Sequence, residues 1–415
     1  MREHLPVPRE KHSTMGGMIM ILDHTSLRDL AGMTDDMGVL SVYATADPRD
    51  TSASPAWRLQ VAQAIDALRD QAAEDGDRER KNAVLHRLDR LGPEIDSMLD
   101  VATSGLGRAL FAPVNGDDVR TLAVQMPLED CAHLESRPYL RPLAAALTTD
   151  GPAGVIAVSR DGVRVIDLRF GVSHELTRFG FEMENEDWRP SRRSMAAGGS
   201  GPASAARAYS GEDRFGRSID EHLLRFFGSV RPRIRAIADR EGWETIAITG
   251  EARLLSVVRK GLESAGGHRD IVMLDHVVEH KSVPEIAAIV QPELHARRLE
   301  RCEAVADEVR STALAGGNGT VGLSDTLGAF REGRVSHLFL DGERHLSGHR
   351  GPDGAYYPQG ETPPGTEAAQ MVPEHDLGER MIELGLNSGA DVTVLPPGPA
   401  DTLIEDGGVA AMLRW

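Results

Sequence analysis

Near the middle of this 415-residue chain lies the stretch Trp188-Arg-Pro-Ser-Arg-Arg-Ser-Met-Ala-Ala-Gly-Gly-Ser-Gly-Pro-Ala-Ser-Ala-Ala-Arg-Ala-Tyr209. Its centre, residues 198–202, holds three glycines, which leave the backbone uncommitted, and Pro202, which lacks an amide hydrogen. The sequence therefore predicts a loop at this place. A plain surface linker with solvated charges is the alternative interpretation of the same composition.

Arginines flank this loop on both sides. They are Arg189, Arg192 and Arg193 before it and Arg207, Arg214, Arg217, Arg225, Arg231, Arg233 and Arg235 after it. The whole chain, in contrast, has a formal net charge of −18. Because phosphate binding needs positive charge at the contact, we expect any nucleic-acid contact to be local, at a tip formed by this stretch.

Composition and motifs predict a soluble cytoplasmic protein without a membrane partner. Cys131 and Cys302 are far apart and belong to no Cys-x-x-Cys pair, which excludes a disulfide framework and a thiolate zinc site. The apolar run at residues 18–22 is shorter than the core of a signal peptide. No stretch approaches the ~18 apolar residues that span a membrane. We expect no cofactor and no metal.

Alternating strand and helix patterns predict an α/β fold with three mixed domains. The expected boundaries are a flexible tail over residues 1–24, an N-terminal domain over 25–150, a middle domain over 151–282 that carries the loop, and a C-terminal domain over 283–415.

Several elements of these domains are specific expectations. Asp161-Gly162 between two β-rich runs predicts a hairpin of residues 155–159 and 163–167. Long helices are expected over residues 84–99, 218–240, 283–313 and 374–386. The Gly- and Pro-rich residues 345–367 are expected to form a surface excursion.

The domain order, the glycine loop with a long helix behind it, and the ending of the chain together resemble one family. The ending comprises Gly389-Ala-Asp-Val-Thr-Val-Leu395 and Gly407-Gly-Val-Ala-Ala-Met-Leu-Arg-Trp415. These features are similar to the archaeal and eukaryotic class-one release factors and pelota. Leu40-Ser-Val-Tyr43 and Arg137-Pro-Tyr-Leu-Arg-Pro-Leu143 resemble more narrowly the bacterial relatives, the Vms/Ankzf-type peptidyl-tRNA hydrolases and Balon-type hibernation factors.

This resemblance implies a ribonuclease H-like middle domain and a C-terminal domain similar to kink-turn-binding ribosomal proteins. It also implies binding to the ribosomal A site, with rRNA and the CCA end of tRNA as partners and a translational GTPase as a further one. Arg189, Arg192, Arg193, Arg207, Arg214 and Arg217 would contact RNA phosphates.

The family's loop carries Gly-Gly-Gln, whose glutamine lies beside the ester of peptidyl-tRNA, but here the sequence is Gly198-Gly199-Ser200. Serine is too short to reach the same point without movement of the backbone. Two interpretations stay open. Either Ser200 or a loop amide orients water and the protein is a peptidyl-tRNA hydrolase, or the loop fills the site without chemistry in hibernation or rescue.

Two further hypotheses come from other classes of protein. A ribonuclease H-like domain could act as a metal-dependent nuclease on RNA, for which Asp161, Asp167 and Asp275 are the available strand carboxylates. The chain could also be a non-catalytic scaffold that binds another protein through its C-terminal domain.

Overall fold

The computed structural model describes residues 18–50, 52, 55–159, 161–180, 222, 224–263, 269–363 and 365–415. By internal contacts the chain forms two compact units: Met1–Gly151 together with Ala296–Trp415, and Pro152–His295. Both units combine helices with sheets, which confirms the α/β class. The expected boundaries of three domains stay predictions.

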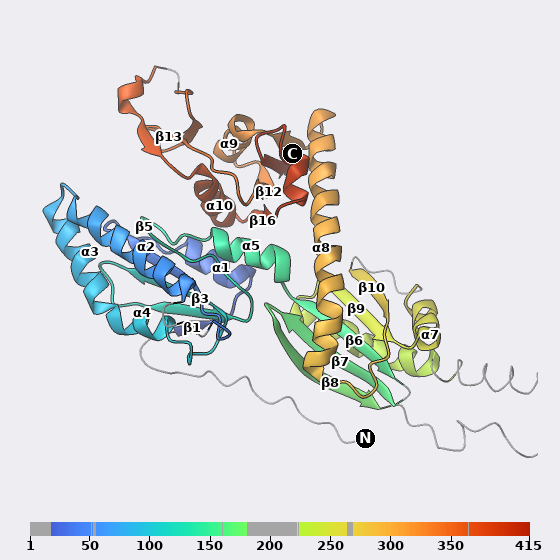
Figure 1. Ribbon diagram of the computed structural model, residues 1–415. Helices are drawn as coiled ribbons and strands as arrows, with labels where there is room; N and C mark the ends of the chain where they lie inside the picture. Colours follow the sequence, from blue (N-terminus) through green and yellow to red (C-terminus); the bar gives the residue numbers. More distant parts are fainter. Residues whose placement is uncertain are drawn as a thin grey trace, which may run out of the picture. The chain divides into compact units, whose positions relative to one another are not determined.

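The first unit contains a five-stranded sheet with the order β1-β4-β3-β2-β5. Figure 1 labels its strands β1, β3 and β5. Its strands are β1 Met18–Met20, β2 Val39–Thr45, β3 Gly107–Pro113, β4 Arg120–Val124 and β5 Cys131–Glu135. Helix α2, Ala56–Ala73, packs Trp57, Val61 and Ile65 against this sheet, because these positions recur at the helical period.

Two helices follow α2 where a single helix over 84–99 was expected. Helix α3, Arg78–Arg90, begins at Asp77, whose side chain accepts from the amides of Glu79 and Arg80. Helix α4, Gly92–Met98, begins directly afterwards with Pro93 in its first turn. Proline has no amide hydrogen and is favoured at a helix start, so it separates the two helices.

The C-terminal residues of the first unit form a second sheet with the order β11-β17-β12-β16. Its strands are β11 Gly319–Val321, β12 Val335–Asp341, β16 Asp391–Leu395 and β17 Val409–Leu413. Strands β12 and β16 are parallel, and α10, Leu377–Asn387, makes the crossover between them. The other helices of the unit are α1 His24–Ala31, α5 Arg141–Asp150 and α9 Leu323–Arg331, with the short η2 Pro399–Leu403.

The Gly- and Pro-rich excursion holds more regular structure than expected. It contributes β13 Gly348–Arg350 and β14 Tyr356–Pro358, which join β15 Val372–Glu374 in a sheet of order β14-β13-β15. A short helical turn, η1 Ala368–Gln370, precedes β15. These strands have three residues each, too few for a periodic signal in the sequence.

The second unit is a three-layer structure around a sheet of order β10-β9-β6-β7-β8. The strands are β6 Ala153–Ser159, β7 Gly162–Arg169, β8 Val172–Gly180, β9 Thr245–Gly250 and β10 Asp270–Asp275. Strands β6, β7 and β8 are antiparallel, whereas β9 and β10 run parallel to β6. This confirms the predicted hairpin. The order is compatible with a ribonuclease H-like domain, which stays a prediction.

Helices cover both faces of this sheet. A helix over residues 224–241 and α7, Ala252–Glu263, pack on the face that includes Val163 and Val165. On the other face, Ile286, Val290 and Leu294 of the long helix α8, Val283–Leu314, join the core.

Helix α8 also supplies residues to the first unit. Ala306 and Val309 lie in the core of the C-terminal sheet. Arg298 donates hydrogen bonds to the backbone carbonyls of Thr149 and Gly151. Arg298, at the start of the second chain segment of this unit, therefore holds the end of the first segment at Thr149 and Gly151.

Candidate functional site

The loop residues and the RNA-binding arginines that the sequence nominates lie outside the described residues. These are Gly198, Gly199 and Ser200 of the loop and the arginines Arg189, Arg192, Arg193, Arg207, Arg214 and Arg217. The described chain stops at Gly180 and continues at residues 222 and 224. The geometry available for a site is that of the two elements that bound this segment, β8 and the 224–241 helix.

Strand β8 leads into the loop segment from the edge of the middle sheet. Its last residue, Gly180, pairs with Gly162 of the β6–β7 turn. Gly162 has a φ of 143°, and an added Cβ would collide with the carbonyl oxygen of Phe179. Only glycine allows this close pairing. The segment therefore leaves the sheet at the end where the β6–β7 hairpin turns.

Ion pairs hold β8 in place. Arg164 and Arg178 lie 2.7 Å and 3.2 Å from the Glu175 carboxylate. Burial opposes ionisation of Glu175, but the hydrogen bonds from both arginines outweigh it and lower the pKa of this carboxyl. Glu175 is therefore a neutralised structural acid on the strand that leads into the loop segment.

The helix over residues 224–241, which follows the loop segment, is amphipathic. Phe227, Val230 and Ala238 are buried against the sheet. Residues 222–238 contain four arginines and no acid. The first acids come at the end of the helix, where Asp239 lies 2.5 Å from Arg269 and Glu241 lies 3.0 Å from both Arg169 and Arg240. The solvent side of the helix before its last turn is therefore positive.

Asp167 of β7 is a structural anchor. Trp243 Nε1 donates to its Oδ1 over 2.7 Å, and Arg169 binds both carboxylate oxygens at 2.5 Å and 2.6 Å. Gly154 leaves the space for this indole, because an added Cβ would overlap the Trp243 ring. With its oxygens occupied in this way, Asp167 is not available as a metal ligand.

The register of the sheet also separates Asp167 from Asp161, two of the three acids of the nuclease hypothesis. Asp161 lies in the turn beside Ser159, whereas Asp167 pairs with Gly154 at the opposite end of β6. Five residues of strand correspond to about 17 Å. Asp275 ends β10 and is exposed. The described residues contain no group of three or more His, Cys, Asp or Glu side chains that could hold a metal ion.

A buried cluster of charged side chains in the first unit was not predicted from the sequence. Glu379, Arg380 and Glu383 of α10 have 0%, 4% and 5% of their surface exposed. Arg380 Nη1 lies 2.8 Å from a Glu383 oxygen, and its other guanidinium nitrogens face Glu135 and Glu374.

Burial changes the acidity of these groups. It raises the pKa of Glu379 well above the usual value for a glutamate. It raises the pKa of Glu383 to about 7, against the opposing charges of Arg380 and Arg137. Shifted pKa values occur in active sites and in structural ion networks alike. The partners in this cluster are backbone amides and other side chains of the same unit, which indicates a structural role.

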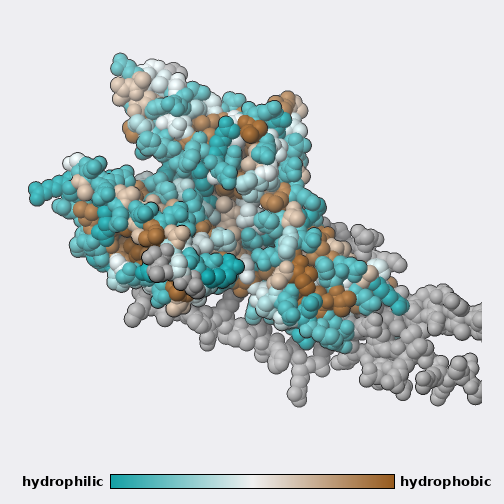
Figure 2. Space-filling view, viewed as in Figure 1, coloured by the Kyte–Doolittle hydropathy of each residue, from teal (hydrophilic) through white to brown (hydrophobic). Residues whose placement is uncertain are grey.

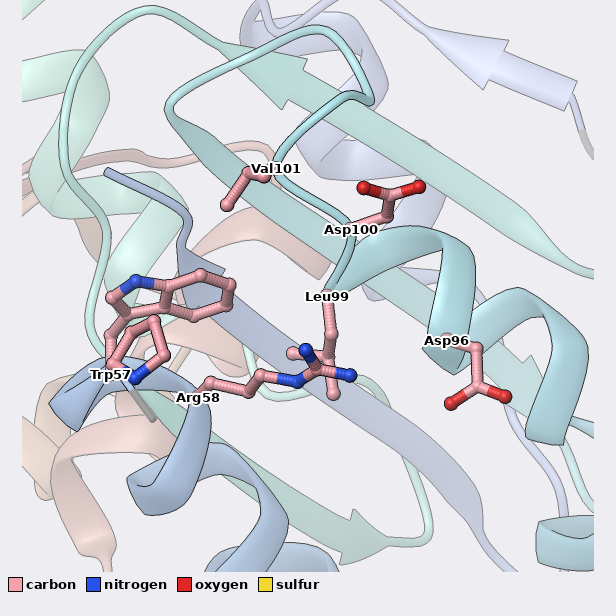
Figure 3. Close-up of a pocket in the computed structure, with 7 residues that line it drawn as sticks. Trp57, Arg58, Asp96, Leu99, Asp100 and Val101 are labelled. Atoms are coloured by element: carbon pink, nitrogen blue, oxygen red, sulfur yellow. The ribbon is translucent and has the colours of Figure 1, made fainter. Parts of the chain in front are cut away.

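The described residues of the first unit line at least two cavities. One, of about 250 Å³, is lined by Trp57 and Arg58 of α2 and by Asp96, Leu99 and Asp100 of α4 and the following loop (Figure 3). The other, of about 360 Å³, is mostly apolar and is lined by α5 residues and by residues 126–129, 342–343 and 394–397. The residues that line these two cavities include no serine, cysteine, lysine or histidine.

Hydrophilic side chains cover most of the face shown in Figure 2, in keeping with the high content of charged residues. Within the described part of the chain, no helix has both the length and the apolar character needed to cross a membrane.

Residues 152–286 match the family model described as bacterial archaeo-eukaryotic release factor family 5. The match begins at the first residue of the second unit, Pro152, and covers nearly all of that unit. It confirms the resemblance to bacterial relatives of the release factors. No curated protein matches the chain.

Similar solved structures come from the release factor and pelota group. The archaeal translation termination factor aRF1 is 15% identical, with 96% of this chain and 99% of that chain covered and a TM-score of 0.24. Pelota of Archaeoglobus fulgidus is 14% identical, with coverage of 74% and 79% and a TM-score of 0.33. A chain of the model of ribosome-bound archaeal Pelota and ABCE1 is 12% identical, with coverage of 95% and 94% and a TM-score of 0.38.

Proposed function

The chain is a bacterial relative of the archaeo-eukaryotic release factors, and we propose that it is a translation factor that binds the ribosomal A site. The observation that carries this proposal is the family match of the second unit. That unit also contains the Gly198-Gly199-Ser200 loop segment. In the proposed complex this loop reaches toward the peptidyl-transferase centre and the CCA end of the tRNA.

The positive helix behind the loop segment supports a partner with negative charge. Four arginines without an acid over residues 222–238 are unusual in a chain with a net charge of −18. A local positive region on an acidic protein directs binding to one end of the molecule. Arg189, Arg192, Arg193, Arg207, Arg214 and Arg217 would add phosphate contacts in the loop segment itself.

Whether the loop performs chemistry depends on Ser200. A serine nucleophile needs a base within hydrogen-bond reach, and the nearest histidines in the sequence are His174 and His222. His174 belongs to β8 and pairs with Asp167 in the strand ladder. We propose that Ser200 or a loop amide orients water for hydrolysis of peptidyl-tRNA; a loop that only fills the site would act in hibernation or rescue.

The test is peptide release from peptidyl-tRNA held in the P site of 70S particles, measured together with co-sedimentation. Wild type, Ser200→Ala and the matched control Ser204→Ala are compared. Release that is lost only in Ser200→Ala, with binding retained, supports the hydrolase. Binding of all three proteins without release supports hibernation or rescue. Absence of binding by the wild type contradicts the ribosome proposal.

A translational GTPase is the proposed second partner, through residues 283–415. Support for this comes from the resemblance of the C-terminal sequence to the release factor and pelota group. The test is whether a ribosome-bound translational GTPase increases the affinity of the full chain for 70S particles. Equal affinity with and without the GTPase would contradict this partner.

The nuclease alternative has no support from the described geometry, because the sheet keeps Asp161 and Asp167 at opposite ends.

A further inference from the structure

We propose that the solvent face of the 224–241 helix is a binding surface for an RNA phosphate backbone, formed by two arginine rows with small residues between them. This inference rests on the proposed function, because it assigns a second RNA contact to the same protein. It concerns described residues, whereas the loop arginines lie outside them.

The helical period places the arginines in two rows. At 3.6 residues per turn, Arg231 and Arg235 lie along one border of the exposed face, and Arg233 and Arg240 lie along the other. Arg225 lies near the middle, at the amino-terminal end. Side chains of Arg225, Arg233, Arg235 and Arg240 are exposed, and that of Arg231 is half-buried.

Small residues occupy most of the surface between the rows, where Asp239 also lies, near the carboxyl-terminal end of the helix. Ser229, Pro232 and Ala236 are exposed and lie on the same side of the helix, at spacings of three and four residues. Their short side chains let a polyanion approach the helix closely, with guanidinium groups on both sides. The distance along the axis from Arg225 to Arg235 is about 15 Å at a rise of 1.5 Å per residue.

Two arginines of this face, Arg233 and Arg235, are not neutralised by the acids nearby. Asp239 and Glu241 are engaged with Arg269, Arg169 and Arg240. Among the described residues, neither Arg233 nor Arg235 has an ion pair or a hydrogen bond through its side chain. Two guanidinium groups with free donors are therefore presented to solvent in a strongly acidic protein.

The chemistry of the face favours RNA over a protein or a membrane. Protein interfaces and membrane-bound helices use exposed large apolar side chains as anchors. None of the exposed large hydrophobic residues of the described chain lies between 224 and 241, because the apolar side of this helix is buried in the unit's core. Arginine is well suited to phosphate, since its planar donors bind two oxygens at once.

The test compares the full-length wild type with the double variant Arg233→Gln/Arg235→Gln. The probe is a fluorescein-labelled transcript of large-subunit ribosomal RNA, titrated at several salt concentrations. We expect the plot of log K against log salt to become less steep, with the magnitude of its slope reduced by about 1.5. Binding at low salt should weaken about tenfold, because two phosphate contacts are lost. The matched control is Arg58→Gln/Arg78→Gln, which removes the same charge from exposed positions of α2 and α3.

Equal slopes for wild type and Arg233→Gln/Arg235→Gln would overturn the inference, and so would an equal loss in the control pair. Arginine-dependent binding to vesicles of phosphatidylserine without binding to RNA would also overturn it. The same proteins are sedimented with 70S particles. If wild type fails to bind these particles but still binds the transcript through Arg233 and Arg235, the inference stands and the proposed function fails. If wild type binds 70S particles and neither assay depends on Arg233 and Arg235, the proposed function stands and the inference fails.

Discussion

Glu379 caps a helix that begins 238 residues earlier in the chain, at Arg141. Its two carboxylate oxygens accept from the backbone amides of Leu140 and Arg141, at 2.5 Å and 3.1 Å. Leu140 is the N-cap of α5 and has no side-chain acceptor of its own. The Arg141 side chain in turn lies 2.5 Å from Asp376, the N-cap residue of α10. Two acids of the first turn and N-cap of α10, Glu379 and Asp376, thus bind the start of α5.

Removal of the Glu379 side chain is expected to destabilise the first unit. Glu379→Ala leaves two buried amides without an acceptor, which costs about 3 kcal/mol in the free energy of unfolding. Glu379→Gln keeps one acceptor and should cost about 1 kcal/mol. Urea unfolding gives the stability, and hydrogen exchange of peptides containing Leu140 and Arg141 reports on the amides. Glu308→Gln, at an exposed position of α8, is the control and should change little. Equal effects of Ala and Gln at Glu379 would contradict the capping role.

Glu383 is expected to make stability depend on pH. Its pKa is about 7 in the folded protein, above the value near 4.5 of an exposed glutamate. The folded state therefore holds a proton that the unfolded state has already lost, so this contribution to stability is complete below about pH 4.5 and is lost as the pH rises through 7. We expect the stability of wild type relative to Glu383→Gln to fall by about 1 kcal/mol per pH unit between pH 5 and 7. A constant difference across this range would show that Glu383 does not titrate as stated.

The ion pair of Arg141 and Asp376 is expected to be strongly coupled. The side chains are 7% and 19% exposed, so solvent screens their interaction little. A double-mutant cycle with Arg141→Met and Asp376→Asn should give a coupling energy of about 2 kcal/mol. The exposed pair Arg28 and Asp391, at 3.3 Å, is the matched control and should give less than about 0.5 kcal/mol. Equal coupling energies for the two pairs would show that burial does not strengthen the ion pair of Arg141 and Asp376.

Substitution of Gly154 is expected to disturb the anchor formed by Trp243 and Asp167. In Gly154→Ala the new methyl group overlaps the indole ring and displaces Nε1 from the carboxylate. We expect the second unit to lose more than about 2 kcal/mol of stability. Gly228→Ala is the control, because nothing lies within 4 Å of the added methyl group and alanine favours the helix. Thermal unfolding that ranks the two variants in the opposite order would contradict the packing argument.

Local patterns in the sequence were sufficient for the hairpin of the middle sheet and for the long helix α8. Asp161-Gly162 marked the hairpin of β6 and β7 correctly, and the long helix α8 was expected from its apolar positions. The strand β8 was missed, because its residues alternate between exposed and half-buried and include few large apolar side chains. A strand at a sheet edge gives only a weak periodic signal.

The charged cluster could not be predicted from local patterns. Glu379, Arg380 and Glu383 look like ordinary solvent-facing residues of an amphipathic helix. Their burial depends on contact with Leu140 and Arg141, and periodicity carries no information about such distant pairs. The absence of a capping side chain at Leu140 was the one available signal, since it implies that another part of the chain supplies the acceptor. The catalytic assignment of Ser200 and the RNA contacts of the loop arginines stay predictions.

The hydrogen bonds from Arg298 to Thr149 and Gly151 have a consequence for the evolution of this architecture. They bring the exit and return points of residues 152–295 together, so this part is topologically an insert in a host made of two chain segments. Deletion of the insert, with Gly151 joined to Ala296 by a few glycines, should leave a host with cooperative unfolding and native circular dichroism. Host and insert can then diverge at different rates, and the family match of residues 152–286 lies within the insert.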